Sequence, residues 1–129
     1  MKRVEYALLY FRQSAEIAEQ LVVGAIVFFP ESNAIKFLKV GKISRIGKLF
    51  GWSTATLVQA YLNGFEKNVT QMPVLGNTTL ENLISQNIIP KDDSSLFFGD
   101  TFYGVTDASE FEFCQELTYR IFSSHVGQN

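Results

Sequence analysis

The chain has 129 residues and a formal net charge of −2, with 47% hydrophobic and 19% charged residues. This length is typical of one domain with one core. The apolar content excludes an intrinsically disordered chain, which would lack the apolar surface needed to offset the entropy cost of ordering. We therefore expect residues 1–129 to form a single folded domain.

Three features of the sequence bear on its compartment. The longest apolar stretch, Leu21 to Pro30, is about half of the roughly 20 residues that a membrane-spanning helix needs. The start of the chain, in which Lys2, Arg3 and Glu5 lead directly into a strand-like segment, lacks the pattern of a secretory signal. A single cysteine, Cys114, cannot form an internal disulfide. These features predict a cytoplasmic protein that does not span a membrane.

Three N-terminal segments carry the β-branched and aromatic residues that are typical of strands. They are Arg3 to Arg12, Leu21 to Phe29 and Ala34 to Val40. The last two flank Pro30-Glu31-Ser32-Asn33, a turn sequence that predicts antiparallel pairing.

The second and third of these segments differ in their patterning. The second is apolar on both faces, which predicts a central strand covered on both sides by helices or by a partner chain. Gly24 within it indicates a bulge or the close approach of another element. In the third segment Ile35 and Phe37 alternate with Lys36, which places this strand nearer an edge.

After Gly41 the apolar period changes from two to about 3.6 residues, which predicts helices. A short helix should bury Ile43, Ile46, Leu49 and Phe50 and end at Gly51-Trp52. Ser53 is then suited to cap a longer helix. The predicted buried stripe of that helix is Leu57, Val58, Tyr61, Leu62, Phe65 and Val69.

Three features are expected in the remainder of the chain. Thr78 and Glu81 have the spacing of a capping box, and the helix that follows should bury Leu80, Leu83, Ile84 and Ile88. Leu96 to Val105 is rich in Phe and Tyr and predicts one bulged strand or a small hairpin. Asp107 to Glu110 should cap a last helix with Phe111, Cys114, Leu117, Ile121 and Phe122 at helical spacing.

The predicted fold class is therefore α+β. We expect an antiparallel sheet of three N-terminal strands plus one or two C-terminal strands, packed by three or four helices.

The sequence offers little catalytic chemistry. Its one histidine, His125, lies eleven residues from Cys114, about three helical turns, so one helix cannot bring both to a common ion. Cys114 falls on an apolar stripe, where a small core residue is the expected role. Gly41 to Lys48 departs from the phosphate-loop pattern in its spacing and in Leu49 after the lysine. We predict no catalytic residue, no metal site and no cofactor, although a small-molecule enzyme that uses one Tyr or Glu stays open.

The clearest polar pattern is a basic run with a period of three residues. Its members are Lys36, Lys39, Lys42, Arg45 and Lys48. Residues 1–65 carry a net charge of +4 and residues 66–129 one of −6, so the total hides a charge asymmetry. The run is either a solvated face, a surface for an acidic protein partner, or a salt-dependent contact for phosphate backbone. A pI near 5.4 argues against a dedicated nucleic-acid binder.

Several segments of the chain resemble the bacterial domain-of-unknown-function 3037 family. They are Tyr6 to Tyr10, Glu19 to Pro30, Phe37-Leu38 with the helix pair that follows, Gly99 to Thr106, and the helix Asp107 to Ser123. Val22 departs from that family, which often has Asn two residues before the strand glycine. The resemblance implies a small bacterial cytoplasmic protein, some of whose relatives lie beside genes for toxin-type kinases, and it implies no established activity.

The sequence thus predicts a non-enzymatic protein-interaction module that binds a partner protein or forms a homodimer. Two observations support this prediction: the scarcity of catalytic side chains, and a central strand that is apolar on both faces. The alternative is a nucleic-acid-associated protein that uses Lys36 to Lys48, either for binding or, with Asp100 and other acids of the last third, for metal-dependent cleavage.

Overall fold

A computed structural model describes residues 1–12, 21–40, 44–71, 78–85 and 96–123 of the chain. These residues form an antiparallel sheet of five strands in the order β3-β2-β1-β4, with β5 also paired to β1. The strands are β1 (Lys2–Phe11), β2 (Leu21–Phe29), β3 (Ala34–Lys39), β4 (Leu96–Phe98) and β5 (Phe102–Thr106). The α+β class is confirmed, and β3 is an edge strand, as its alternating pattern predicts.

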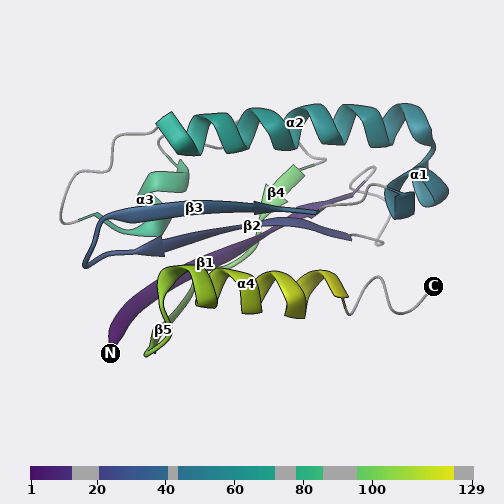
Figure 1. Cartoon of the computed structure of the whole chain (residues 1–129). Helices are drawn as coiled ribbons and strands as arrows, with labels where there is room; N and C mark the ends of the chain where they lie inside the picture. The colour runs from purple at the N-terminus through teal and green to yellow at the C-terminus, as the bar shows by residue number, and fades with distance from the viewer. Residues whose placement is uncertain (13–20, 41–43, 72–77, 86–95, 124–129) are drawn as a thin grey trace.

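Helices cover both faces of the sheet (Figure 1). One face packs against α1 (Ser44–Phe50), α2 (Trp52–Gln71) and α3 (Leu80–Leu83). The other packs against α4 (Glu110–Thr118), which continues as a π-helical turn, η2 (Tyr119–Ser123). The sheet therefore separates two apolar cores, a large one beneath α2 and a smaller one above α4.

Strand β2 lies at the centre of this arrangement, and each of its residues except Val22 is buried. Ile26 and Phe28 belong to the core beneath α2, whereas Val27 and Phe29 belong to the core on the α4 side. Because the chain's own helices cover both faces of β2, its apolar character does not call for a partner chain. This corrects one of the two reasons for which the sequence predicts an interaction module.

Gly24 lies at a strand irregularity and at a close approach of another strand, the two features that a glycine within a strand predicts. Leu9 pairs with Gly24 but Tyr10 pairs with Val22, so the register shifts at this point. A Cβ atom at position 24 would lie 2.9 Å from the carbonyl oxygen of Leu38, too close for any larger residue. The glycine thus allows β3 to approach β2 closely where the strand pair is irregular.

Helix α2 differs from its prediction in two respects. It begins at Trp52, directly after Gly51 with a φ of 94°, so Ser53 lies inside the first turn and is not the N-cap. Its buried residues are Ala55, Val58, Leu62, Phe65 and Val69. Leu57 and Tyr61 are exposed instead, because the stripe that faces the sheet is narrower than the apolar pattern suggests.

Helices α3 and α4 are capped by hydrogen bonds. In α3 the N-cap is Thr79, one residue later than predicted, and its Oγ1 accepts from the Asn82 N–H at 3.2 Å. The buried carboxylate of Glu5 in β1 accepts from the Leu80 N–H at 3.0 Å, which ties α3 to the sheet. In α4, within the predicted segment, Ser109 is the N-cap of a capping box with Glu112.

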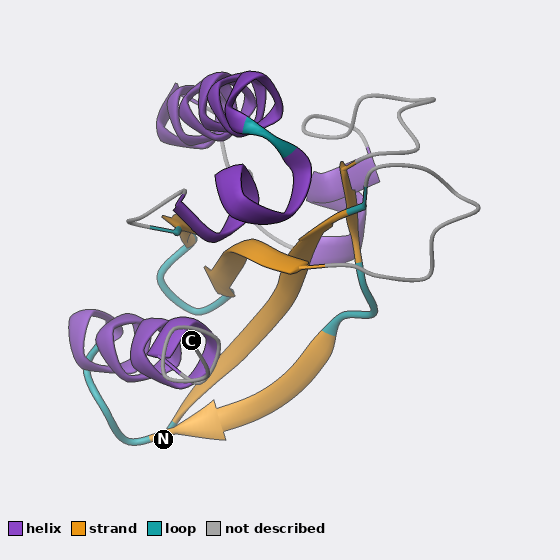
Figure 2. Ribbon diagram, turned by 90° about the vertical axis from the view of Figure 1, so that its right-hand side faces the viewer, coloured by secondary structure: helices purple, strands orange, loops and turns teal. Residues whose placement is uncertain are grey.

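Strands β4 and β5 do not pair with each other as a hairpin would. Both pair with β1, β4 along its C-terminal half and β5 along its N-terminal half. Ring stacking reinforces both pairings, Tyr10 on Phe97 at 5.5 Å and Tyr6 on Phe102 at 5.0 Å. The segment is therefore one interrupted strand beside β1, and β5 forms the edge of the sheet opposite to β3 (Figure 2).

Candidate functional site

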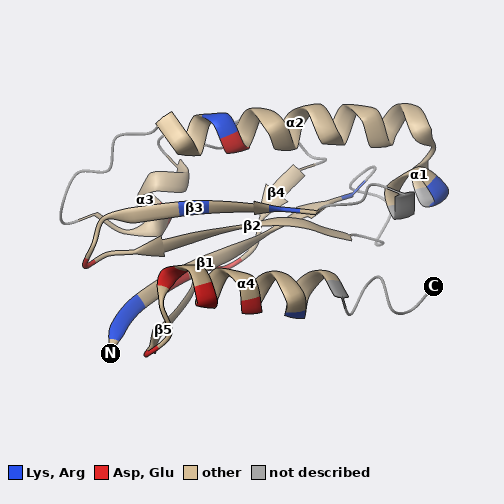
Figure 3. Ribbon diagram, in the orientation of Figure 1, with Lys and Arg blue, Asp and Glu red and all other residues tan. Residues whose placement is uncertain are grey.

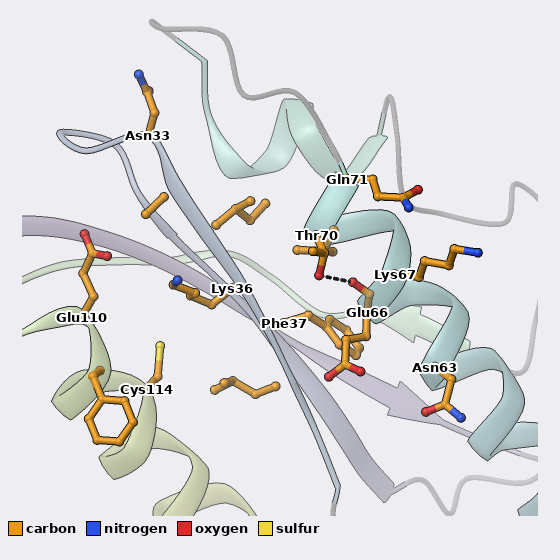
Figure 4. A pocket seen from close by; sticks show the side chains of 15 residues that line it. Asn33, Lys36, Phe37, Asn63, Glu66, Lys67, Thr70, Gln71, Glu110 and Cys114 are labelled. Carbon is orange, nitrogen blue, oxygen red and sulfur yellow. Dashed lines mark hydrogen bonds between the residues drawn. The ribbon is translucent and has the colours of Figure 1, made fainter.

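A groove of about 1000 Å³ lies along β3 between α2 and α4, and we call it the β3 groove. The turn and strand 33–38 form its floor. Its walls are formed by Asn63, Glu66, Lys67, Val69, Thr70 and Gln71 of α2 and by Glu110, Phe111 and Cys114 of α4 (Figure 4). The floor is thus a sheet edge, and the walls are helices from the two sides of the sheet.

The backbone of β3 presents hydrogen-bonding groups to this groove. The Val40 N–H donates to the Val23 carbonyl. This hydrogen bond establishes which residues of β3 direct their backbone N–H and C=O groups toward β2. In an antiparallel pair, every second residue bonds to the neighbouring strand. Lys36 and Leu38 therefore bond to β2, and the backbone groups of the alternate residues point away from it. The outward N–H and C=O groups belong to Ile35, Phe37 and Lys39. No strand among the described residues pairs with them.

Side chains of β3 alternate between the two walls. Phe37 lies toward α2, where its ring is 6.2 Å from that of Phe65. Lys36 points to the other side, toward Glu110 and Cys114 of α4 (Figure 4). A ligand strand added to β3 would continue this alternation, because side chains of neighbouring strands keep to the same face.

The charged groups of the β3 groove fall into two kinds. Glu66 and Glu110 are engaged: Lys39 Nζ lies 3.0 Å from Glu66 Oε1, and Ser32 Oγ donates to Glu110 Oε2 at 2.6 Å. Lys36 and Lys67 are exposed and have no polar partner among the described residues. The α4 wall therefore carries both Lys36 and the Glu110 carboxylate, whose Ser32 partner is uncharged, and Lys67 is the exposed cation of the α2 wall.

The fold separates the described members of the predicted basic run. Lys36 and Lys39 lie on opposite sides of the sheet, and Lys39 also donates to Asn63 Oδ1 at 2.8 Å. Lys48 is exposed on α1 and does not line the groove. Figure 3 shows the Lys and Arg residues of the described chain spread over several elements. Lys42 lies outside the described residues, and Arg45 is described only as part of the α1 backbone. The described members of the run do not form one continuous surface.

Cys114, the one cysteine of the chain, lines the groove. Its thiol is buried on α4, and burial raises its pKa despite the nearby Lys36. A protonated, buried thiol is a core group and a poor nucleophile. His125 lies outside the described residues. Within those residues there is no cluster of three or more His, Cys, Asp or Glu side chains suited to hold a metal ion.

Sequence patterning alone did not identify the α2 wall of the groove. Asn63, Glu66, Lys67 and Thr70 recur at intervals of three, one and three residues, which is a polar stripe beside the buried one. This spacing indicates a polar face on the helix. That the face borders a groove depends on β3 lying next to it, which residue spacing within the helix does not reveal.

Comparisons with protein-family models, with curated proteins and with solved structures found no match to the chain. The resemblance to the domain-of-unknown-function 3037 family therefore stays a prediction. In the part of the chain that the structure describes, no helix has both the length and the apolar character needed to cross a membrane.

Proposed function

We propose that the chain is a protein-interaction module of the bacterial cytoplasm that binds an extended segment of a partner protein as an added strand along β3. The observation that carries this proposal is the outward-facing backbone of Ile35, Phe37 and Lys39 on the floor of a groove. Strand addition uses such an edge for affinity and the flanking pockets for specificity.

The shape of the β3 groove favours a single extended segment over a folded sheet. Helices α2 and α4 border β3 on its two sides, so an approaching strand must enter between them (Figure 1). A second copy of the chain would bring its own α2 and α4 to the same place, and these helices would collide. A single extended segment has no flanking helices and avoids this collision.

The charges of the groove indicate what the segment carries. Lys36 on the α4 side and Lys67 on the α2 side have no acidic partner among the described residues. An acidic side chain toward each wall would complement them. On the α4 side Phe111 is 74% exposed and offers an apolar contact. We infer an acidic segment whose two acids are adjacent or three residues apart, so that they face opposite walls, with an apolar residue toward the α4 wall.

The test is a selection of short random peptides displayed on phage against the whole protein, followed by synthesis of the enriched peptides. We expect enriched sequences to contain Asp or Glu and to bind more weakly as salt rises. The Lys36→Glu/Lys67→Glu double variant should weaken binding about tenfold, because two attractive contacts become repulsive. Lys48→Glu is the matched control, since it reverses an exposed charge outside the groove.

Two outcomes would overturn this proposal. One is a failure to enrich any peptide above a control protein. The other is equal loss of binding in the Lys48→Glu control and in the groove variant. Retention of nucleic acid that depends on Lys36 and Lys48 alike, with no enriched peptide, would instead favour the alternative role of the basic run.

A further inference from the structure

The second free edge of the sheet, along β5, has a different character. Phe102, Tyr103 and Val105 are 48%, 63% and 59% exposed. The Leu8 carbonyl accepts from the Gly99 N–H at 2.9 Å, so Leu8 bonds on the side of β4 and β5. Residues of β1 alternate in this respect, so Val4 and Tyr6 bond to Gly104 and Phe102. The N–H and C=O groups of Tyr103 and Val105 therefore point outward, and no described strand pairs with them.

In the part of the chain that the structure describes, this edge lacks the features that prevent natural sheet edges from pairing. Such edges carry lysines, prolines or covering elements, and β3 accordingly has two lysines and two flanking helices. The sequence of β5, Phe-Tyr-Gly-Val-Thr, contains no charge and no proline. Helix α4 lies nearer to the β3 edge of the sheet than to the β5 edge (Figure 2). An uncharged, exposed apolar edge is a template for strand pairing.

We propose that β5 pairs antiparallel with β5 of a second copy of the chain, about a two-fold axis through Gly104. In this register Tyr103 of each copy faces Val105 of the other, and both residues bond through the groups that point outward. Phe102 then faces Thr106 of the other copy. Each opposed pair joins an aromatic residue to a β-branched one, a favourable cross-strand combination.

Gly104 supports the position of the axis. A Cβ atom at this residue would meet nothing within 4 Å, and its φ lies outside the left-handed region, so no contact inside the chain requires glycine. On the axis, however, the two residues at position 104 form a pair without hydrogen bonds, whose Cα atoms lie about 4.5 Å apart. Glycine there leaves room for Phe102 of each copy at the diagonal position.

The chemistry of the edge favours a second copy over an unrelated partner. In the proposed register, the outward N–H and C=O groups of one β5 meet C=O and N–H groups of the other. No like charges lie opposite each other, because β5 carries no charged residue. The interface is small, because five residues a side fall short of the roughly 1,600 Å² of a standard interface. We therefore expect a dimer that forms at high protein concentration and dissociates on dilution.

The first test is a cross-link across the axis. Gly104→Cys places two thiols at a Cα separation of about 4.5 Å, within the range that a disulfide spans. With oxidised glutathione as the oxidant, we expect this variant to form a covalent dimer at high concentration. Lys48→Cys, an exposed cysteine away from β5, is the matched control and should cross-link far more slowly.

The second test is sedimentation equilibrium of the wild type and of Gly104→Lys. The open space at position 104 allows the lysine to be accommodated in the monomer, whereas two lysines on the axis would repel. We expect a concentration-dependent dimer for the wild type, with its association at least tenfold weaker in the variant. A wild type that is monomeric at all concentrations, or a dimer unaffected by Gly104→Lys, would overturn the inference.

This inference does not rest on the proposed peptide binding. The variants at position 104 leave the β3 groove unchanged, and those at Lys36 and Lys67 leave β5 unchanged. Loss of one activity is therefore distinguishable from loss of the other.

Discussion

The two edges of the sheet have the same backbone chemistry and different surroundings. Strand β3 carries lysines and lies between two helices, whereas β5 is uncharged and has no described strand along its outer side. What an edge accepts is therefore decided by its side chains and its neighbours, since the unpaired N–H and C=O groups are common to both. On this account β3 accepts a lone acidic strand and β5 accepts a copy of itself.

The largest effect should come from proline within β3. Lys36→Pro removes an N–H that bonds to β2, and we expect it to lower the free energy of unfolding by about 3 kcal/mol. Lys39→Pro removes an N–H that points outward, and loss of the partly exposed Lys39–Glu66 ion pair should cost at most about 1 kcal/mol. Urea unfolding of both variants measures the difference. Equal destabilisation would mean that the assignment of outward groups on β3 is wrong.

A smaller effect is expected at the start of the α4 wall. Ser109→Ala removes the N-cap of α4 and should lower the melting temperature by roughly 4 °C. Hydrogen bonds from the Ser109 backbone and side chain lower the pKa of Glu112. That carboxylate therefore stabilises the fold above its unfolded pKa, and the stabilisation is lost as the pH falls through its folded pKa.

Thermal unfolding of Ser109→Ala and wild type across the acidic range separates these contributions. The variant should lose somewhat less stability on acidification than the wild type does, because Glu112 loses the Ser109 hydroxyl and keeps the hydrogen bond from the backbone N–H of residue 109. An identical pH dependence in both proteins would contradict the role of the capping box.

The fold shows how far the sequence predicts its own structure. Strand patterning identified β1, β2 and β3 and placed β3 at an edge, because apolar alternation reports directly which faces are buried. It left open whether residues 96–105 form a hairpin or an interrupted strand. That choice depends on pairing with β1 far away in the chain, which local pattern does not encode.

The candidate sites were harder to predict for the same reason. The basic run has a regular period in the sequence, but a strand and a helix project their side chains differently, so the period does not define one surface. The β3 groove combines β3 with segments that lie more than twenty residues away along the chain. At α2 the predicted helix start differs by two residues from the observed one, because Gly51, and not Ser53, ends the preceding turn.

The smallest effect concerns Cys114 at the α4 wall of the β3 groove. Because burial raises its pKa, the thiol should react slowly with iodoacetamide at neutral pH. A peptide bound in the groove should slow this reaction further, whereas dimerisation through β5 should leave it unchanged. Mass spectrometry of the labelled protein measures the rate. Protection by dimerisation but not by peptide would reverse the assignment of the two edges.

The most direct test of the two-edge account is amide hydrogen exchange of the wild-type protein as its concentration is raised, with no variant and no added ligand. The account predicts that the amides of Tyr103 and Val105 become protected at high concentration while those of Ile35, Phe37 and Lys39 do not change. Protection that appears at the β3 amides and not at β5 would contradict it, because β3 would then be the edge that binds a second copy.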